Sequence, residues 1–283
     1  MADPTWILTL SCQDRPRIVA TVASAIAVLG GNIAESAQFW DRGSNRFFMR
    51  LSFVAPEAVD EHALRAVLAS MTKDFGMEVQ LNRADILPRI VVMVSKFDHC
   101  LEHLLYQIRV GWLRAEVVAI VSNHDAAVTA AGIAGVPCHI WPVTRDNKAE
   151  QEARLSALVE ETGAELVVLA RYMQVLSNEL SSRLFGRIIN IHHSFLPSFK
   201  GAKPYHQAHE RGVKIIGATA HYVTPDLDEG PIIEQETERV THALSAEDFV
   251  AVGRDIESRV LGRAVKLHLE RRVLLNGHKT VVF

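Results

Sequence analysis

Short, continuous apolar runs recur through the C-terminal two-thirds of the chain, each followed by a segment in which apolar residues have helical spacing. The runs predicted as strands are Ile90–Val94, Val117–Val121, Cys138–Ile140, Leu166–Ala170 and Ile188–His192. Strands that are buried on both faces and separated by helices are typical of a parallel sheet covered by helices on each side. The pattern therefore predicts a doubly wound, mostly parallel α/β domain, whose ligands bind beyond the carboxyl ends of the strands.

The first 85 residues carry a different pattern, in which a hairpin joins two strand-and-helix units. The predicted order of strand, helix, strand, strand, helix and strand covers Trp6–Ser11, Arg17–Leu29, Ile33–Phe39, Arg46–Val54, Glu57–Phe75 and Glu78–Asn82. This βαββαβ order is the ferredoxin-like α+β arrangement, with both helices on one face of an antiparallel sheet. Because Pro88 interrupts any continuing element, we predict two domains, residues 1–85 and 86–283.

The segment from Asp14 to Ala20, followed by Gly31, Asn32 and Ile33, gives the N-terminal domain a family resemblance. It resembles the ACT domain, a regulatory module that pairs in oligomers and often binds amino acids at the loop after its first strand. That family usually has glycine where Arg17 stands, and a Cβ there would crowd a ligand that approaches the backbone. The resemblance thus favours an oligomerisation surface over amino-acid sensing, and it implies a homo-oligomer, either a dimer or a tetramer.

Charge and composition exclude several classes of partner. Lys and Arg total 30 against 33 Asp and Glu, a formal charge of -3, which gives no field that favours phosphate backbones. The residues Met1–Thr5 lack the basic and apolar regions of a signal peptide, and no window reaches the ~18 apolar residues that span a bilayer. We therefore expect a cytoplasmic protein without nucleic-acid or membrane partners. Cys12, Cys100 and Cys138 lie far apart and are interpreted as buried free thiols.

Asn190 and His192 stand two residues apart at the end of a predicted strand, so their side chains share one face and can reach one atom. Both donate hydrogen bonds, which suits a carbonyl oxygen that gains negative charge under attack. Asp228 lies in the loop Asp226–Pro231, which can return to the strand ends. Paired with His192, Asp228 can keep the imidazole protonated, or it can orient a water and accept its proton. The sequence leaves both roles open.

The motifs around these three residues are similar to those of the 10-formyltetrahydrofolate-dependent formyltransferase family, over about residues 89–283. The matching segments are Asn190-Ile191-His192, Ser194, Leu196-Pro197, Gly201 and Leu227 to Ile233. The resemblance implies that Asn190, His192 and Asp228 form a catalytic triad. It also implies that a segment lining the folate pocket includes Met173, Gln174, Val175 and Leu176.

The turn after the first strand of this domain, Ser95 to Cys100, contains no glycine. The family's ribonucleotide enzyme has a glycine-rich turn there, whose backbone N–H groups hold a phosphate. The runs 189–197, 201–208 and 215–222 are instead similar to the formyltetrahydrofolate deformylase family, which also joins an ACT domain to a formyltransferase-like domain. Membership would imply hydrolysis of 10-formyltetrahydrofolate to tetrahydrofolate and formate, with water replacing the amine acceptor and no metal or redox cofactor.

Three alternatives remain beside this interpretation. Five of the thirteen histidines fall between residues 192 and 221, which suggests a metal-dependent hydrolase, although His206 and His209 lack the HExxH pattern. A formyltransferase to an unphosphorylated amine would use the same triad, and a non-catalytic folate or amino-acid sensor would keep the fold. His193 is expected to anchor its loop, and His221 to orient Asp228 or a water.

Three charged residues in the long helix predicted over 246–268 resemble a ligand patch. They are Arg254, Glu257 and Arg263. Because an amphipathic helix usually turns its charged residues to solvent, we interpret them as the solvated face of this helix.

Overall fold

The computed structural model describes residues 3–196 and 204–283, and the chain divides into two compact units. The first unit runs to Leu87 and includes Glu270–Asn276 and Thr280–Phe283, and the second runs from Pro88 to Leu269 with Gly277–Lys279. The predicted division after residue 85 lies two residues from this boundary. The C-terminal segment, predicted as part of the second domain, groups mainly with the first. The motif residues Pro197 and 201–203 lie outside the described residues.

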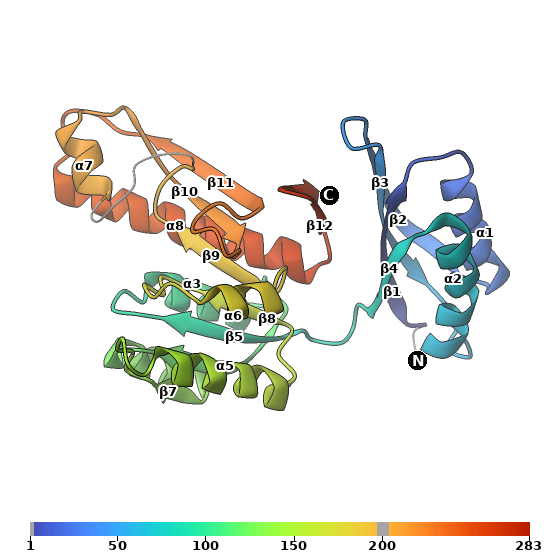
Figure 1. The fold of residues 1–283 in the computed structure, drawn as a ribbon, viewed down its shortest axis with the longest axis horizontal. Coiled ribbons are helices and arrows are strands. Elements are labelled where there is room, and N and C mark those ends of the chain that lie inside the picture. The colour runs from blue at the N-terminus through green and yellow to red at the C-terminus, as the bar shows by residue number, and fades with distance from the viewer. Residues whose placement is uncertain (1–2, 197–203) are drawn as a thin grey trace. The chain divides into compact units, whose positions relative to one another are not determined.

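The first unit is a four-stranded antiparallel sheet with two helices, α1 (Ile18–Val28) and α2 (Glu61–Phe75), as the βαββαβ pattern predicts (Figure 1). In spatial order its strands are β2 (Asn32–Asp41), β3 (Arg46–Val54), β1 (Thr5–Gln13) and β4 (Glu78–Arg83). Alternate residues of the central strands, such as Leu8 and Met49, form a buried core with Val22 of α1. The helices therefore cover one face of the sheet.

Helix α2 begins four residues later than the sequence pattern predicts. The side chain of Asp60 accepts a hydrogen bond from the backbone N–H of Ala63 at 2.8 Å, and Asp60 itself is extended. An aspartate in this geometry caps the first turn of a helix, because it satisfies a backbone donor that has no partner within the helix. The predicted start at Glu57 was therefore wrong, because the spacing of apolar residues gives no information on which residue caps the helix.

The C-terminal segment contributes charged groups to the first unit. Arg50, which is buried on β3, contacts Glu35 at 2.8 Å and donates to the backbone oxygen of Glu270 at 3.1 Å. Arg272 contacts the same Glu35 carboxylate at 3.1 Å, and the hydrogen bonds from Arg272 and Arg50 lower the pKa of Glu35. Two strands form a hairpin at the C-terminal end of this segment. They are β12 (Val273–Asn276) and β13 (Lys279–Val282).

The second unit contains a seven-stranded, mostly parallel sheet, which confirms the predicted α/β class (Figure 1). In spatial order its strands are β11 (Ile232–Arg239), β10 (Ile215–Tyr222), β9 (Ile188–His192), β8 (Leu166–Leu169), β5 (Arg89–Val94), β6 (Glu116–Ser122) and β7 (Cys138–Ile140). Neighbours from β9 to β7 run parallel, whereas β10 and β11 are antiparallel to their neighbours. Strand β11 is not among the predicted elements, because this edge strand is largely polar and exposed.

Helices cover both faces of the larger sheet. They are α3 (His99–Arg109), α4 (Val128–Ala134), α5 (Lys148–Thr162), α6 (Asn178–Arg183), α7 (Pro204–Glu210) and α8 (Ala246–Leu269), with a 3-10 turn at Asp125–Ala127. On one face, Leu155 of α5 and Leu180 of α6 pack with Val91 and Val167 of the sheet. On the other, α8 contacts α3 and runs along β9, β10 and β11 (Figure 1).

The order of the parallel strands creates a switch point between β5 and β8. Strands β6 and β7 extend from one side of β5, and β8 and β9 extend from the other. The chain leaving β5 at Ser95 and the chain leaving β8 at Ala170 therefore diverge, and such a crevice is where open α/β sheets bind ligands. The loops that follow β5, β8 and β9 therefore border the expected ligand site.

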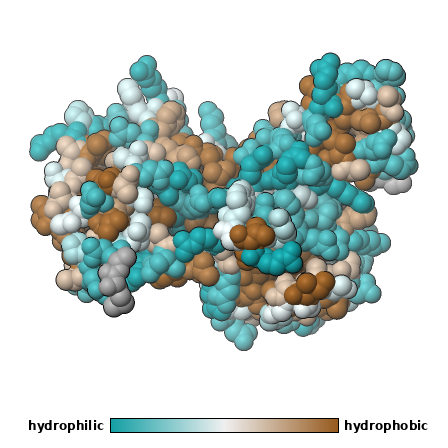
Figure 2. Space-filling view, turned by 180° about the vertical axis from the view of Figure 1, so that it is seen from behind, coloured by the Kyte–Doolittle hydropathy of each residue, from teal (hydrophilic) through white to brown (hydrophobic). Residues whose placement is uncertain are grey.

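Exposed apolar side chains are distributed over the second unit. On the face shown in Figure 2, they lie among hydrophilic residues. Met173 and Val175, on the loop after β8, and Phe195, after β9, are each about half exposed or slightly less. Across the described ranges, no helix combines the length and the apolar character needed to cross a membrane.

Candidate active site

Strands β9 and β10 place four polar side chains on one face of the sheet. In their antiparallel register His221 lies opposite Asn190, and Thr219 lies opposite His192. Residues two apart on a strand share a face, as do residues directly opposite each other. The amide nitrogen of Asn190 consequently lies 3.3 Å from Nε2 of His221.

Asp228 completes this group from the loop between β10 and β11. Its Oδ1 lies 3.2 Å from Nδ1 of His192 and 3.6 Å from Nε2 of His221. Asp228 has a φ of 58°, in the left-handed region that aspartate tolerates better than most residues. The structure therefore brings together Asn190, His192, His221 and Asp228, which the sequence had proposed for one site.

Gly230 lets the Asp228 loop pack directly on β10. A Cβ at this position would overlap the carbonyl oxygen of Tyr222, and it would lie 3.3 Å from Nδ1 of His221. The backbone N–H of Tyr222 donates to the oxygen of Pro231 at 2.9 Å, which closes the base of the loop. The glycine is required because the close approach leaves no space for a side chain.

The neighbours of His221 and Asp228 set their protonation. Nδ1 of His221 lies 2.9 Å from the carbonyl oxygen of Tyr222, so this nitrogen carries a proton and donates. Nε2 then faces the Asn190 amide and the Asp228 carboxylate. The hydrogen bond from His192, together with the close approach of His221, holds the pKa of Asp228 far below its usual range, against the opposing effect of burial. Asp228 is therefore ionised at neutral pH.

The segment after β9 is fixed by the buried hydroxyl of Thr219. This hydroxyl donates to the backbone oxygen of Ser194 at 3.0 Å and accepts from the N–H of Leu196 at 3.1 Å. The ring of His193 stacks on that of His192, with centroids 5.1 Å apart. Burial, helped by the charge of Arg171, lowers the pKa of His193 to about 4. His193 is therefore neutral at physiological pH.

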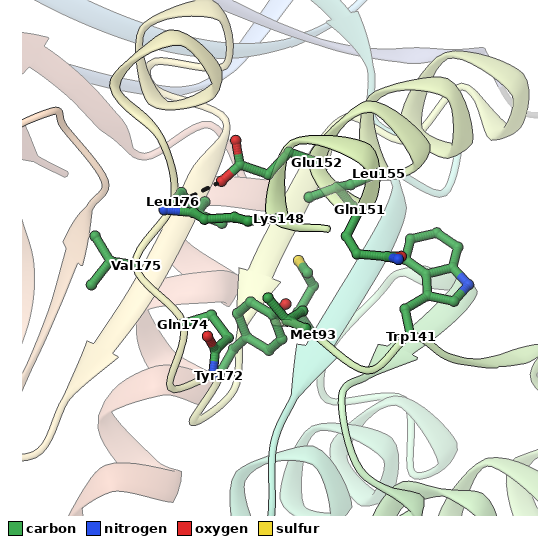
Figure 3. A pocket seen from close by; sticks show the side chains of 11 residues that line it. Met93, Trp141, Lys148, Gln151, Glu152, Leu155, Tyr172, Gln174, Val175 and Leu176 are labelled. Atoms are coloured by element: carbon green, nitrogen blue, oxygen red, sulfur yellow. Dashed lines mark ion pairs between the residues drawn. The ribbon is translucent and has the colours of Figure 1, made fainter. Parts of the chain in front are cut away.

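An open pocket lies between the loop after β8 and helix α5 (Figure 3). Side chains of α5 face those of the loop across it, and Lys148 forms an ion pair with Glu152 at 3.9 Å. The pocket is lined by Met93, Trp141, Val143, Lys148, Gln151, Glu152, Leu155, Tyr172, Gln174, Val175 and Leu176. Three of the four predicted folate-binding residues thus line one cavity. The fourth, Met173, is exposed beside it, and its N–H donates to the hydroxyl of Ser95 at 3.0 Å.

A second polar cluster was missed by the sequence analysis. Glu257 is only 1% exposed, so its interpretation as part of the solvated face of α8 was wrong. Its carboxylate contacts Nε2 of His99 at 2.8 Å, the hydroxyl of Tyr205 at 2.8 Å and Nε of Arg171 at 3.2 Å. Helical spacing held the signal, because Glu257 stands four residues after the buried Gly253, within the apolar stripe of α8.

His99, Cys100 and Glu257 form the one group of potential metal ligands among residues 3–196 and 204–283, with ligand atoms within 4.8 Å of one another. The chemistry of this group fits a metal poorly. Both carboxylate oxygens already accept from protein donors, and the Arg171 cation competes for the position of a metal. Burial also raises the pKa of the Cys100 thiol strongly, which opposes the thiolate that a metal binds. Cys12 is likewise buried, Cys138 is half-buried, and all three thiols are free.

Comparison with known proteins assigns the family. Residues 88–265 match the family model described as formyl transferase. A formyltetrahydrofolate deformylase of Corynebacterium sp. (strain P-1) is 48% identical over 98% of this chain and 97% of its own length. Another deformylase, from Bacillus subtilis, is 46% identical over 98% of this chain and 93% of its length.

A solved structure extends the similarity to the whole fold. The crystal structure of a formyltetrahydrofolate deformylase from Pseudomonas putida KT2440 is 50% identical and superposes with a TM-score of 0.94. The similarity covers 99% of this chain and 100% of that chain, so it includes both units. The chain therefore belongs to the formyltetrahydrofolate deformylase family, with its formyl transferase domain at residues 88–265.

Proposed function

We propose that the protein hydrolyses 10-formyltetrahydrofolate to tetrahydrofolate and formate. The observation that carries this proposal is the convergence of Asn190, His192 and Asp228, in a chain that resembles deformylases along its whole length. Attack of water on a formyl carbon needs donors for the developing oxyanion and a group that holds the water. These three side chains supply both functions.

In this mechanism Asn190 and His192 stabilise the oxygen of the tetrahedral intermediate. Nδ1 of His192 is engaged by Asp228, which leaves Nε2 to donate to the oxyanion. The antiparallel pairing of β9 with β10 holds both donors before the substrate arrives. Donors that are already oriented lower the barrier because they need no reorganisation during the reaction.

Asp228 positions the attacking water or accepts its proton. Both contacts with His192 and His221 use Oδ1, and we assign Oδ2 to the water. The strongly lowered pKa keeps the carboxylate ionised, and it also makes Asp228 a weak base, which favours the positioning role. No atom changes its oxidation state during hydrolysis, so the mechanism requires no redox cofactor. Asp228 supplies the group that holds the water, and Asn190 and His192 supply the oxyanion donors, so the proposed mechanism assigns no step to a metal.

The folate occupies the pocket between the loop after β8 and α5. Gln174, Val175 and Leu176 line this pocket, and bound folate would cover the exposed side chains of Met173 and Val175. Largely apolar walls with a few polar groups are typical of sites for aromatic ligands. His193 and His221 support the reacting end of the substrate, His193 by packing on His192 and His221 by orienting Asn190 and Asp228.

The first unit acts, in our proposal, as an ACT-like domain through which the chain forms a homo-oligomer in the cytoplasm. Arg17 is exposed and has a φ of 79°, a conformation that glycine adopts at lower cost. A side chain at this loop obstructs an amino-acid effector and so favours association over sensing. Light scattering at micromolar protein concentration tests this role, and a monomer would contradict it.

Release of formate and tetrahydrofolate, measured without any amine acceptor, tests the proposed activity. We expect equal amounts of both products, before and after treatment with a chelator. Asp228→Asn should abolish release, and Asp226→Asn, a matched change at an exposed position of the same loop, should retain it. Release of tetrahydrofolate without formate, and only after addition of an amine, would assign a transferase, and substrate binding without any product would assign a regulator. Either result would contradict the proposal.

A further inference from the structure

The crevice at the switch point between β5 and β8 is filled on the α8 side by side chains of the chain itself. We call His99, Arg171, Tyr205 and Glu257 the Glu257 cluster. Its members come from the start of α3 after β5, from the loop after β8, from α7 and from α8. Glu257 contacts the other three at distances between 2.8 and 3.2 Å. A ligand site of the fold is here occupied by a buried carboxylate and its donors.

The Glu257 cluster neutralises its own charge. Burial raises the pKa of Glu257, but the hydrogen bond from His99 and the charge of Arg171 outweigh it and hold the pKa below its usual range. Burial also keeps the Tyr205 hydroxyl protonated, since it raises the pKa of that group strongly. A carboxylate with one cation and two further donors has no strong attraction left for another charged ligand.

Two local features accommodate the cluster at some cost in stability. A Cβ at Gly253 of α8 would overlap the ring of Tyr205, so glycine makes the space in which that ring reaches Glu257. Arg171 has a φ of 65°, a left-handed conformation that is strained for a residue with a Cβ. Strain of this kind persists where the surroundings impose it, and it is concentrated at functional sites.

His193 connects the Glu257 cluster to the triad. Its ring stacks on His192 at 5.1 Å and lies 6.5 Å from the ring of Tyr205. The folate pocket lies on the α5 side of the loop after β8, and the cluster lies on the α8 side. With the formyl group at the triad, the pocket holds the folate, and the cluster borders the opposite side.

We propose that the Glu257 cluster determines the choice of nucleophile, because it fills the space beside the triad in which an amine acceptor would bind. Water needs no such space, since Asp228 alone can hold it. This inference rests on the proposed hydrolysis and adds specificity-determining residues to it. Arg171 links the cluster to the loop that carries the folate-binding residues, because it belongs to that loop and its Nε lies 3.2 Å from Glu257.

The two possible reactions differ only in the nucleophile. In hydrolysis the water oxygen bonds to the formyl carbon, the bond from that carbon to N10 breaks, and a proton from water reaches N10. In transfer the nitrogen of an amine bonds to the same carbon, and the proton that the amine loses reaches N10. Neither reaction needs an oxidant or a reductant, so transfer requires only that an unprotonated amine reach the formyl carbon and pass its proton to N10.

The test uses substitutions that open the crevice without leaving a buried charge unpaired and without straining the backbone. Arg171→Gly removes the guanidinium at a position whose φ favours glycine, and Glu257→Gln removes the carboxylate charge that would remain unpaired. The double variant carries both changes. His99→Ala is a second variant, which opens the cluster from the α3 side. Arg17→Gly, at an exposed arginine of the first unit that also has a positive φ, is the matched control.

The measurement is the ratio of formylated amine to formate, with hydroxylamine as a small probe and glycinamide as a larger one. Reactions without protein give the uncatalysed background for each amine. We expect the original protein and Arg17→Gly to release formate with no formylated amine above background. The double variant and His99→Ala should raise the ratio by about tenfold or more, the scale on which steric exclusion discriminates between substrates.

Failure of this inference is distinct from failure of the proposed function. If the original protein and both opened variants release formate at an unchanged ratio, the Glu257 cluster does not select water. If the original protein already formylates glycinamide at a rate comparable to formate release, the obstruction does not exist. If no formate forms in the absence of amine, the proposed hydrolysis fails, and this inference fails with it.

Discussion

Asp228 and Glu257 are two carboxylates of the second unit whose pKa values are both held below the usual range, yet their surroundings differ. Asp228 lies on a loop, its side chain is 27% exposed, and its partners are two histidines. The Glu257 side chain lies on a long helix, is 1% exposed, and contacts an arginine, a histidine and a tyrosine. A lowered pKa therefore does not by itself identify a catalytic group. The greater exposure of Asp228, and the role in holding water that we propose for it, distinguish it from Glu257.

The two carboxylates should also differ in what their removal affects: loss of Asp228 should lower activity, and loss of Glu257 should lower stability. The Asp228 side chain is itself 27% exposed, so solvent can replace part of its contacts and the fold can tolerate the loss of its carboxylate. Removing Glu257 leaves the Arg171 cation buried without its counter-charge, and the desolvation cost of that cation is then uncompensated. Substitutions at each carboxylate can therefore distinguish an effect on activity from an effect on stability.

Asp228→Asn should have the largest effect on activity. Loss of the charged group that holds the water should lower kcat by about 10²- to 10⁴-fold, the range for a positioned acid–base group. Single-turnover formate release measures the effect, and thermal unfolding should change less than it does in Glu257→Ala. The proposed role of Asp228 would be wrong if kcat stayed within about twofold of the Asp226→Asn control.

Glu257→Ala should have the largest effect on stability. Breaking a buried ion pair by removing one partner costs about 3 to 5 kcal/mol of the free energy of unfolding. Urea denaturation measures this loss, and the double variant with Arg171→Gly should lose less than the sum of the two single changes. Additive losses would show that Arg171 and Glu257 do not stabilise each other.

The sequence was informative where the signal is local. The apolar runs that become β5 and β8 predicted the parallel sheet, and the motif residues Asn190, His192 and Asp228 predicted one site, because strand period and loop position bring them to one edge. Glu257 was misjudged because a glutamate on a helix is usually solvated, although its spacing places it in the apolar stripe of α8. The partners that stabilise it there, Arg171, Tyr205 and His99, lie 52 to 158 residues away, and pairings over such separations leave no periodic signal in the sequence.

The loop that carries Asp228 should be sensitive to a single methyl group at Gly230. In Gly230→Ala the added Cβ would overlap the carbonyl oxygen of Tyr222, so the loop must move. A displacement of about 1 Å at a reacting group can cost about 10²-fold in rate. The control is Gly132→Ala in α4, where a Cβ meets no atom within 4 Å. Formate release at the control rate in Gly230→Ala would show that Asp228 does not need this close packing.

His193, which lies between the triad and the Glu257 cluster, should make the free energy of unfolding depend on pH. Its pKa falls from 6.5 to about 4 on folding, chiefly through burial, so the unfolded chain binds a proton in this window that the native state does not. Stability should therefore fall as the pH is lowered from 7 towards 4 and level off below that value. Linkage converts the pKa difference into about 2 kcal/mol between pH 7 and pH 5.

Urea denaturation of His193→Gln at pH 7 and pH 5 isolates this contribution. The loss of stability between the two pH values should be smaller than in the original protein by about 2 kcal/mol. His62→Gln, at an exposed histidine on α2, should retain the full loss. Because the neutral His193 ring packs between His192 and Tyr205, its protonation at low pH should also separate the triad from the Glu257 cluster. An equal pH dependence in the original protein and His193→Gln would mean that the His193 ring is charged, or solvated, in the native state.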